Sequence, residues 1–175
     1  MKVKTTFIKG LKIVKSEKHK DKRGYFREVF IEKLLKNKFT FSCLSKSKKN
    51  VFRGLHIQTK DPQAKFVSVL KGEILDVIID LRKKSKTFGK LFKIKLSEKN
   101  ATSVLIPRGC AHGFLGLKKE NLVYYLCDQY RQEKFETGII FNDKNIKVKW
   151  PKKIILSTKD KKNITINEYK KIYDR

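Results

Sequence analysis

The sequence predicts an all-β fold, a sandwich or barrel with jelly rolls among the options. Short apolar segments recur along the 175 residues, and turn signals separate them. Helical periodicity is scarce. An apolar share of 39%, with 12 Phe, 6 Tyr and 1 Trp, argues against disorder despite the high charge. At this length we expect one domain, spanning 1–175, that buries about two-thirds of its unfolded surface.

The first expected strand is 25–30, directly after a glycine. Residues 66–70 and 74–81 are rich in β-branched side chains, and Lys71-Gly72 between them is typical of a hairpin. Residues 90–96 alternate between apolar and polar side chains, as a half-buried strand does.

The second half of the chain continues the β pattern. Residues 103–106 run into the turn signal 107–109, and residues 111–117 and 121–127 resemble another pair of strands. A further short strand is expected at 139–141. The two segments with helical character are 31–36 and Ile166–Tyr173.

The net charge of +27 comes from Lys pairs spread over the whole chain. A nucleic-acid binder more often gathers such charge into one stripe with stacking aromatics. We therefore interpret the lysines as a solvated surface and do not expect a nucleic-acid partner. Such a field still attracts anionic ligands, including nucleotide diphosphates.

The start of the chain interrupts its apolar residues with Lys, so it lacks the apolar core of a signal peptide. No run approaches the roughly 20 apolar residues of a membrane span. We expect a cytoplasmic protein without a membrane partner. Cys43, Cys110 and Cys127 are odd in number and far apart, so we expect them to be reduced and structural.

The segment 52–65 concentrates side chains that suit catalysis: Arg53, His56, Gln58, Gln63 and Lys65. An imidazole exchanges protons near neutral pH. An Arg holds a phosphate through its planar fork, and a Lys stabilises a developing oxyanion. This combination indicates proton abstraction from a phosphorylated carbonyl compound.

The run 107–112 resembles the second motif of cupins, P-x-G-x-x-H, and cupins are double-stranded β-helix jelly rolls. The resemblance narrows the expected fold to a cupin-type jelly roll with a few short helices. A metal-binding cupin also carries H-x-H, where this chain has His56-Ile57-Gln58. Two histidines without a nearby third ligand make a poor transition-metal site, so we predict no catalytic metal.

A longer set of motifs resembles the dTDP-4-dehydrorhamnose 3,5-epimerase family. The motifs occur in family order within 5–162, and they are residues 21–28, 45–58, 80–82, 85–89, 106–114, 150–151 and 156–160. The resemblance implies an isomerase of a nucleoside-diphosphate 4-keto sugar, in the biosynthesis of capsule or lipopolysaccharide sugars. The keto group acidifies the hydrogens at C3 and C5, so a base, an oxyanion stabiliser and an acid suffice, with no cofactor.

The same resemblance assigns catalytic roles. His56 is the base, Asp160 orients its ring, Lys65 faces the enolate oxygen and Tyr130 is the acid on the opposite face. Structural alternatives remain for each, such as a packed core residue for His56 or a helix N-cap for Asp160. Tyr124 and Tyr125 are substitutes for Tyr130, because the spacing around Tyr130 departs from the family pattern.

The implied substrate-binding residues come from three parts of the chain. Arg23 and Arg53 grip the diphosphate, and Glu28 holds an Arg or sugar hydroxyls. The remaining members of the binding set are Gln58, His112 and His19. We leave Arg82 out of the site as a structural ion-pair residue.

Four residues depart from the family at positions that meet the ligand: His19, Ser42, Leu44 and Phe141. Loss of a hydrogen-bonding amide alters specificity strongly, so the sugar and the nucleotide stay open. One alternative is a GDP-linked 4-keto-heptose, epimerised at C3 or C5 only.

Two other classes compete with the epimerase. One is a non-catalytic cupin-like module that binds an acidic polymer, and the other is an isomerase that moves the keto group. The full set of Arg53, His56, Lys65 and Asp160 favours the epimerase. The resemblance also implies a homodimer with exchanged N-terminal strands, and we expect residues 5–14 to lack a partner in their own chain.

Overall fold

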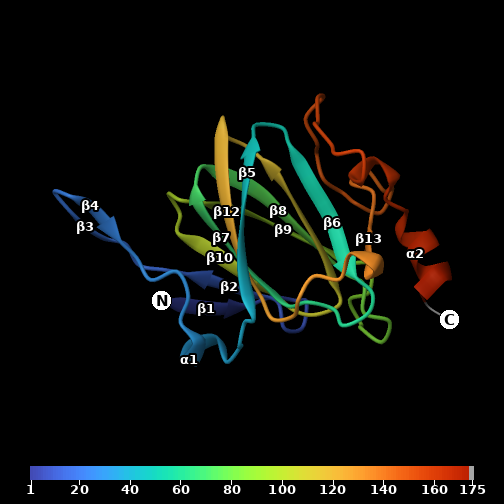
Figure 1. Cartoon of the computed structure of the whole chain (residues 1–175), viewed down its shortest axis with the longest axis horizontal. Helices are drawn as coiled ribbons and strands as arrows, with labels where there is room; N and C mark the ends of the chain where they lie inside the picture. Colours follow the sequence, from blue (N-terminus) through green and yellow to red (C-terminus); the bar gives the residue numbers. More distant parts are fainter. Residues whose placement is uncertain (174–175) are drawn as a thin grey trace.

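The structure is a computed structural model that describes residues 1–173. Two antiparallel sheets face each other and form the body of the molecule (Figure 1). In order across the six-stranded sheet, the strands are β1 (Lys2–Thr5), β2 (Lys12–Lys15), β10 (Thr102–Ile106), β7 (Lys65–Lys71), β12 (Glu120–Cys127) and β5 (Phe41–Lys48). The five-stranded sheet has the order β13 (Glu136–Gly138), β6 (Phe52–Gln58), β11 (Cys110–Gly116), β8 (Glu73–Asp80) and β9 (Leu91–Ser97).

The expected all-β fold is confirmed. Helices are short and few: α1 (Glu32–Leu35), α2 (Ile166–Tyr173) and the 3₁₀ turns η1 (Glu133–Phe135) and η2 (Asp160–Lys162). Both predicted helices are therefore confirmed, and α2 has the predicted bounds. No helix within 1–173 has the length and apolarity needed to cross a membrane.

The hairpin predicted at Lys71-Gly72 is wrong. β7 and β8 belong to different sheets, and so do β11 and β12, so the chain passes from one sheet to the other at each connection. Gly72 permits the corner, because its φ is +82° and an added Cβ would lie 2.2 Å from the carbonyl oxygen of Glu120. Sheet-to-sheet crossing between consecutive strands is the jelly-roll pattern.

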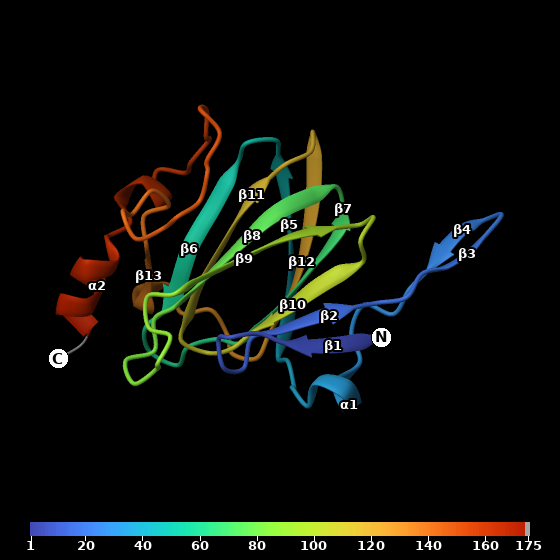
Figure 2. The same cartoon turned by 180° about the vertical axis from the view of Figure 1, so that it is seen from behind.

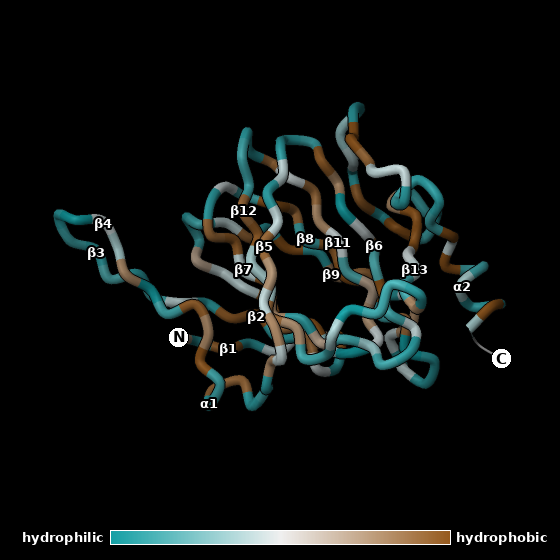
Figure 3. The backbone as a smooth tube through the Cα atoms, in the orientation of Figure 1, coloured by the Kyte–Doolittle hydropathy of each residue, from teal (hydrophilic) through white to brown (hydrophobic). Residues whose placement is uncertain are grey.

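The core has two layers because the five-stranded sheet is buried on both faces. Ile74 and Ile78 of β8 belong to a cluster between the two sheets, together with residues of β7, β10 and β12. Val77 and Ile79 of the same strand face the opposite way, into a cluster with the C-terminal segment. Burial on both faces explains the continuous apolar run at 74–81. Figures 2 and 3 show α2 next to β13, at the edge of the five-stranded sheet, and Figure 3 shows hydrophobic stretches along the central strands.

The N-terminal region differs from expectation. β2 pairs with both β1 and β10, so residues 12–15 have partners in their own chain and the expectation of an unpaired 5–14 is wrong. The strand predicted at 25–30 is limited to β4 (Gly24–Phe26), which pairs with β3 (His19–Asp21). This β3–β4 hairpin projects away from the body (Figures 1 and 2).

Candidate active site

A histidine and a carboxylate meet inside the sandwich. His56 lies on β6, and its Nε2 is 2.5 Å from Oδ1 of Asp160 at the start of η2. Burial acts to raise the pKa of Asp160, but the hydrogen bond and charge of His56 outweigh burial and lower it. An ionised carboxylate only accepts hydrogen bonds, so Nε2 carries the hydrogen. The other ring nitrogen, Nδ1, is then free to take up a proton.

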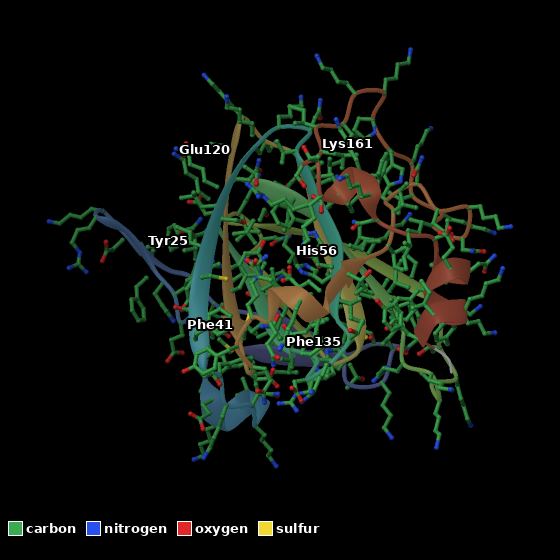
Figure 4. All side chains as sticks on the ribbon, turned by 45° about the vertical axis from the view of Figure 1, so that its right-hand side comes forward. Tyr25, Phe41, His56, Glu120, Phe135 and Lys161 are labelled. Atoms are coloured by element: carbon green, nitrogen blue, oxygen red, sulfur yellow. The ribbon has the colours of Figure 1, made fainter. Side chains whose placement is uncertain are left out.

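His56 and Asp160 border a cavity of about 450 Å³. This volume lies within the range of small-molecule sites. Figure 4 shows His56 in the middle of the body, between β5 and β6. The lining residues come from both sheets and the C-terminal segment, and they are Phe41, Cys43, Arg53, His56, Gln63, Lys65, His112, Gly113, Phe114, Tyr125, Cys127, Arg131, Glu136, Ser157, Lys159 and Asp160.

Lys65, the first residue of β7, lies in this cavity. Burial lowers the pKa of its ammonium, and nearby Cys127 and Glu136 partly oppose that effect. A desolvated cation gains more from an approaching negative charge than a hydrated one does. Lys65 is therefore suited to stabilise an oxyanion that forms inside the cavity.

Arg53, on the same strand as His56, lies at the edge of the cavity. Its Nε donates to Oγ of Ser47 at 2.9 Å, and its Nη2 donates to the carbonyl oxygen of Lys46 at 3.2 Å. These bonds hold the guanidinium in place while other N–H groups stay available. The predicted set of His56, Asp160, Lys65 and Arg53 is thus brought together.

His112 also lines the cavity, and it is more deeply buried than His56. Its Nε2 lies 2.8 Å from Oδ2 of Asp76, a fully buried carboxylate on β8. Within the described residues, the other oxygen of Asp76 has no hydrogen-bond partner. The ring of Tyr125 meets that of His112 edge-on, at 6.2 Å. His112 is thereby fixed as part of the cavity wall.

The structure does not bring Tyr130 to the cavity. Its side chain is 67% exposed and stacks on Phe41, with ring centroids 6.0 Å apart. Tyr125 lines the cavity instead, and its hydroxyl lies 3.2 Å from Oγ of Ser45. Burial raises the pKa of Tyr125, so its phenol stays protonated. Tyr125, one of the two substitutes, is thus the tyrosine that lines the cavity.

Gln58 is placed away from the lining residues. Its Nε2 donates to the carbonyl oxygen of Asp61 at 2.8 Å, and its Oε1 accepts from the N–H of Gln132 at 2.9 Å. The buried amide therefore ties two loops together rather than facing a ligand.

Three predicted binding residues lie on or next to the projecting hairpin. Arg23, Glu28 and His19 are exposed, and none lines the cavity of its own chain. Arg23 instead pairs with Asp21 at 2.6 Å. In Figure 4, the hairpin residue Tyr25 lies beyond β5 from His56.

The expected specificity positions on β5 are wrong by one residue. Ser42 and Leu44 face outward, and Leu44 is 58% exposed. Phe41 and Cys43 face the cavity. The period of two along a strand puts neighbouring residues on opposite faces, so strand phase was the missing signal. Phe141 does not line the cavity either, since it packs on Phe52 and Trp150.

Sequence reasoning also missed a charged cluster at the cavity. Glu136 accepts from Nε of Arg131 at 2.8 Å and pairs with Nζ of Lys159 at 2.5 Å. Burial acts to raise the pKa of Glu136, but these two cations outweigh it and bring the pKa to about 2. Both cations can also meet an anionic ligand. Lys159 lies within the motif 156–160 but was assigned no role, and Arg131 lies outside the motifs.

A larger groove of about 1290 Å³ lies elsewhere, and lysines dominate its lining. It is open to solvent and holds none of the residues assigned to catalysis. Within residues 1–173, no group of three or more His, Cys, Asp or Glu side chains is placed to hold a metal ion.

A jelly roll that encloses a carboxylate-supported imidazole and a desolvated ammonium defines the class of cupin-type enzymes that move protons on an anionic substrate. Comparison with known proteins makes the assignment specific. The family profile described as dTDP-4-dehydrorhamnose 3,5-epimerase matches residues 5–168. The chain belongs to this family and is an isomerase, an epimerase of nucleotide-linked 4-keto sugars.

Individual relatives agree. The dTDP-4-dehydrorhamnose 3,5-epimerase of Methanothermobacter thermautotrophicus is 39% identical over 165 residues, which cover 89% of each chain. The epimerase of Legionella pneumophila, solved in complex with dTDP-4-keto-L-rhamnose, superposes with a TM-score of 0.90 at 37% identity and covers 95% of this chain and 93% of its own. The epimerase of Bacillus anthracis, solved with TDP and PPi bound, has a TM-score of 0.90 at 35% identity, covering 94% and 98%.

Proposed function

We propose that this protein epimerises a dTDP-linked 4-keto-6-deoxy sugar at both C3 and C5. The observation that carries the proposal is the His56–Asp160 pair, which shares one cavity with Lys65. A base with a free ring nitrogen and a nearby, partly buried cation are the two groups that enolate formation requires. The cytoplasmic location expected from the sequence fits work on a nucleotide-linked sugar.

The proposed reaction uses these groups in turn. Nδ1 of His56 takes the hydrogen from the carbon next to the keto group, and the electron pair moves onto the keto oxygen. Lys65 stabilises the resulting enolate. Tyr125 then returns a proton to the same carbon from the opposite face, and the configuration inverts. Asp160 supports the imidazolium while it carries the proton.

The nucleotide assignment rests on the relatives and on the charge of the cavity. Two solved relatives hold a dTDP sugar and TDP. Arg53, Arg131 and Lys159 border the cavity here and would meet a diphosphate. Thermal shifts with TDP, GDP and UDP provide the test, because a ligand raises the melting midpoint according to its affinity. A larger shift with GDP would support the GDP-linked alternative.

We also propose a homodimer in which the β3–β4 hairpin of one subunit reaches the cavity of the other. Phe26 and Tyr25 of the hairpin are 67% and 41% exposed, and neighbouring exposed aromatic side chains of this kind are typical of an interaction surface. The arrangement would give Arg23 and Glu28 a place near a substrate. Light scattering should report a dimer, and Arg23→Ala should raise KM more than it lowers kcat.

The function itself is tested by incubating the enzyme with dTDP-4-keto-6-deoxyglucose in deuterated water. NMR should show deuterium at C3 and C5 and a product with both centres inverted. Deuterium at one carbon only would replace the proposal with single-centre epimerisation. Absence of exchange on every nucleotide-linked 4-keto sugar would contradict it.

A further inference from the structure

Two cysteines from neighbouring strands meet in the wall of the cavity. Cys43 of β5 stands opposite Tyr125 of β12, and Cys127 of β12 stands opposite Phe41 of β5. The two cysteines are therefore diagonal neighbours on one face of the sheet, and both line the cavity. They lie far apart in the sequence, and only the strand register brings them together.

The two thiols face the same cavity but differ in character. Lys65 is the cross-strand partner of Cys127 and adds positive charge beside both thiols. The neighbouring thiol of Cys127 and the charge of Lys65 lower the pKa of Cys43 to about 7. The thiol of Cys43 and burial raise the pKa of Cys127. Cys43 is exposed and Cys127 is buried.

The third cysteine has neither feature. Cys110 lies in the core between the sheets, and burial raises its pKa to about 12. Thiolate character and exposure control the oxidation of a cysteine, so Cys110 should be inert. It provides an internal comparison for the other two.

We propose that the Cys43–Cys127 pair is an oxidation site, which hydroperoxides convert into a disulfide that reversibly inactivates the enzyme. An accessible thiolate with a second thiol beside it is the arrangement found in redox-sensitive proteins. The activity part of this inference rests on the proposed function, whereas the covalent change does not.

The chemistry balances with hydrogen peroxide as the oxidant. The Cys43 thiolate attacks one peroxide oxygen, the O–O bond breaks, and the departing hydroxide takes a proton to become water. Cys43 is then a sulfenic acid. The sulfur of Cys127, losing its proton to the departing hydroxide, attacks the Cys43 sulfur and releases a second water. The thiol pair loses two electrons, and the peroxide gains them.

The sheet can accommodate the bond. Diagonal neighbours in a sheet are farther apart at their Cα atoms than most disulfide-bonded cysteines. β5, however, is the last strand of its sheet, and within residues 1–173 its one partner strand is β12, so β5 can shift toward that neighbour. The bond would then move Cys127 beside Lys65 and change the wall that faces the enolate.

The test treats the full-length enzyme and its Cys43→Ser, Cys127→Ser and Cys110→Ala variants with hydrogen peroxide. Intact mass, non-reducing electrophoresis and activity are measured, each activity being normalised to that of the untreated variant. The wild type and Cys110→Ala should lose two hydrogens in mass and at least about tenfold in activity, since small displacements of catalytic groups cost at least this much. Dithiothreitol should restore both.

The serine variants separate the two steps. Cys127→Ser should stop at the sulfenic acid, which dimedone traps on Cys43, and Cys43→Ser should resist peroxide. Binding of TDP should slow the wild-type reaction if the nucleotide covers the pair. Inactivation of Cys43→Ser at the wild-type rate, a disulfide between subunits, or a mass change without the Cys43–Cys127 bond would overturn the proposal.

Discussion

His112 stands directly opposite His56 across β11 and β6, yet each ring is bonded to a different carboxylate. The side chain of His56 is 33% exposed, and that of His112 is 5% exposed. The two neighbouring imidazoles therefore differ in both exposure and hydrogen-bond partner. His56 can reach a substrate atom, whereas His112 and Asp76 hold the wall behind it.

Removal of the Asp76 carboxylate should destabilise the fold. Asp76→Ala leaves the buried His112 without its hydrogen-bond partner, and leaving a buried polar group unpaired costs about 2 kcal/mol in the free energy of unfolding. Urea denaturation measures the change. Glu17→Ala, at an exposed carboxylate, is the control and should stay within about 0.5 kcal/mol of wild type. Equal stability of both variants would contradict the assigned role of Asp76.

Removing the hydroxyl of Tyr125 should lower kcat far more than removing that of Tyr130. Tyr125→Phe removes a phenol that lines the cavity, so kcat should fall by about a hundredfold or more, as for a general acid. Tyr130→Phe removes a hydroxyl from an exposed ring and should leave kcat nearly unchanged. The reverse order would restore Tyr130 as the acid and place it in the cavity during turnover.

Replacement of Lys65 should lower the activity without lowering the stability of the fold. Lys65→Met removes the stabilisation of the enolate oxygen and should lower kcat by about 10²–10³. It also removes the desolvation that lowers the pKa of Lys65, so the free energy of unfolding should not fall. Kinetics and thermal melts test both parts. A large loss of stability with an unchanged kcat would make Lys65 a structural residue.

Asp80 should make the fold sensitive to acid. Burial acts to raise its pKa, but hydrogen bonds from Arg82, Ser85 and Thr87 outweigh it and bring the pKa from 3.8 to about 2. A depressed carboxyl pKa adds stability that is complete above about pH 4 and is lost as the pH falls toward about 2. At 1.36 kcal/mol per pKa unit, the contribution is about 2 kcal/mol.

Asp80→Asn should therefore flatten the fall in unfolding free energy between about pH 4 and pH 2, measured in urea. Glu17→Gln, at an exposed carboxylate, is the control and should leave the slope unchanged. An unaltered slope in Asp80→Asn would contradict the assignment. The Asp80–Arg82 pair, with Nη2 to Oδ2 at 2.7 Å, also confirms that Arg82 has a structural partner.

The local sequence pattern predicted where several strands lie, but it did not predict which strands pair with each other. The runs at 66–70 and 74–81 are β-branched and apolar enough to mark β7 and β8, but local pattern cannot tell a hairpin from a corner between sheets. β5 went unpredicted because its sequence, FSCLSKSK, buries little and lacks a clear alternation. Pairing depends on contacts that are distant in the sequence, which single segments do not encode.

The site was partly predictable for a similar reason. Arg53, His56 and Lys65 lie in one short segment, so their chemistry is visible in the sequence. Asp160 lies 104 residues from His56, and only the family resemblance linked them. The sequence did not place Cys43 in the cavity, because a shift of one residue in the alternation of a strand moves a side chain to the opposite face.

Deuterium exchange in His56→Ala tests the central claim most directly. Each variant is incubated with dTDP-4-keto-6-deoxyglucose in deuterated water, with Lys161→Ala as a control for a change in the turn that holds Asp160. Exchange at C3 and C5 should fall by about 10²–10⁴ in His56→Ala. Exchange in Lys161→Ala should stay close to the wild-type rate. Substantial exchange in a folded His56→Ala enzyme would contradict the assignment of His56 as the base.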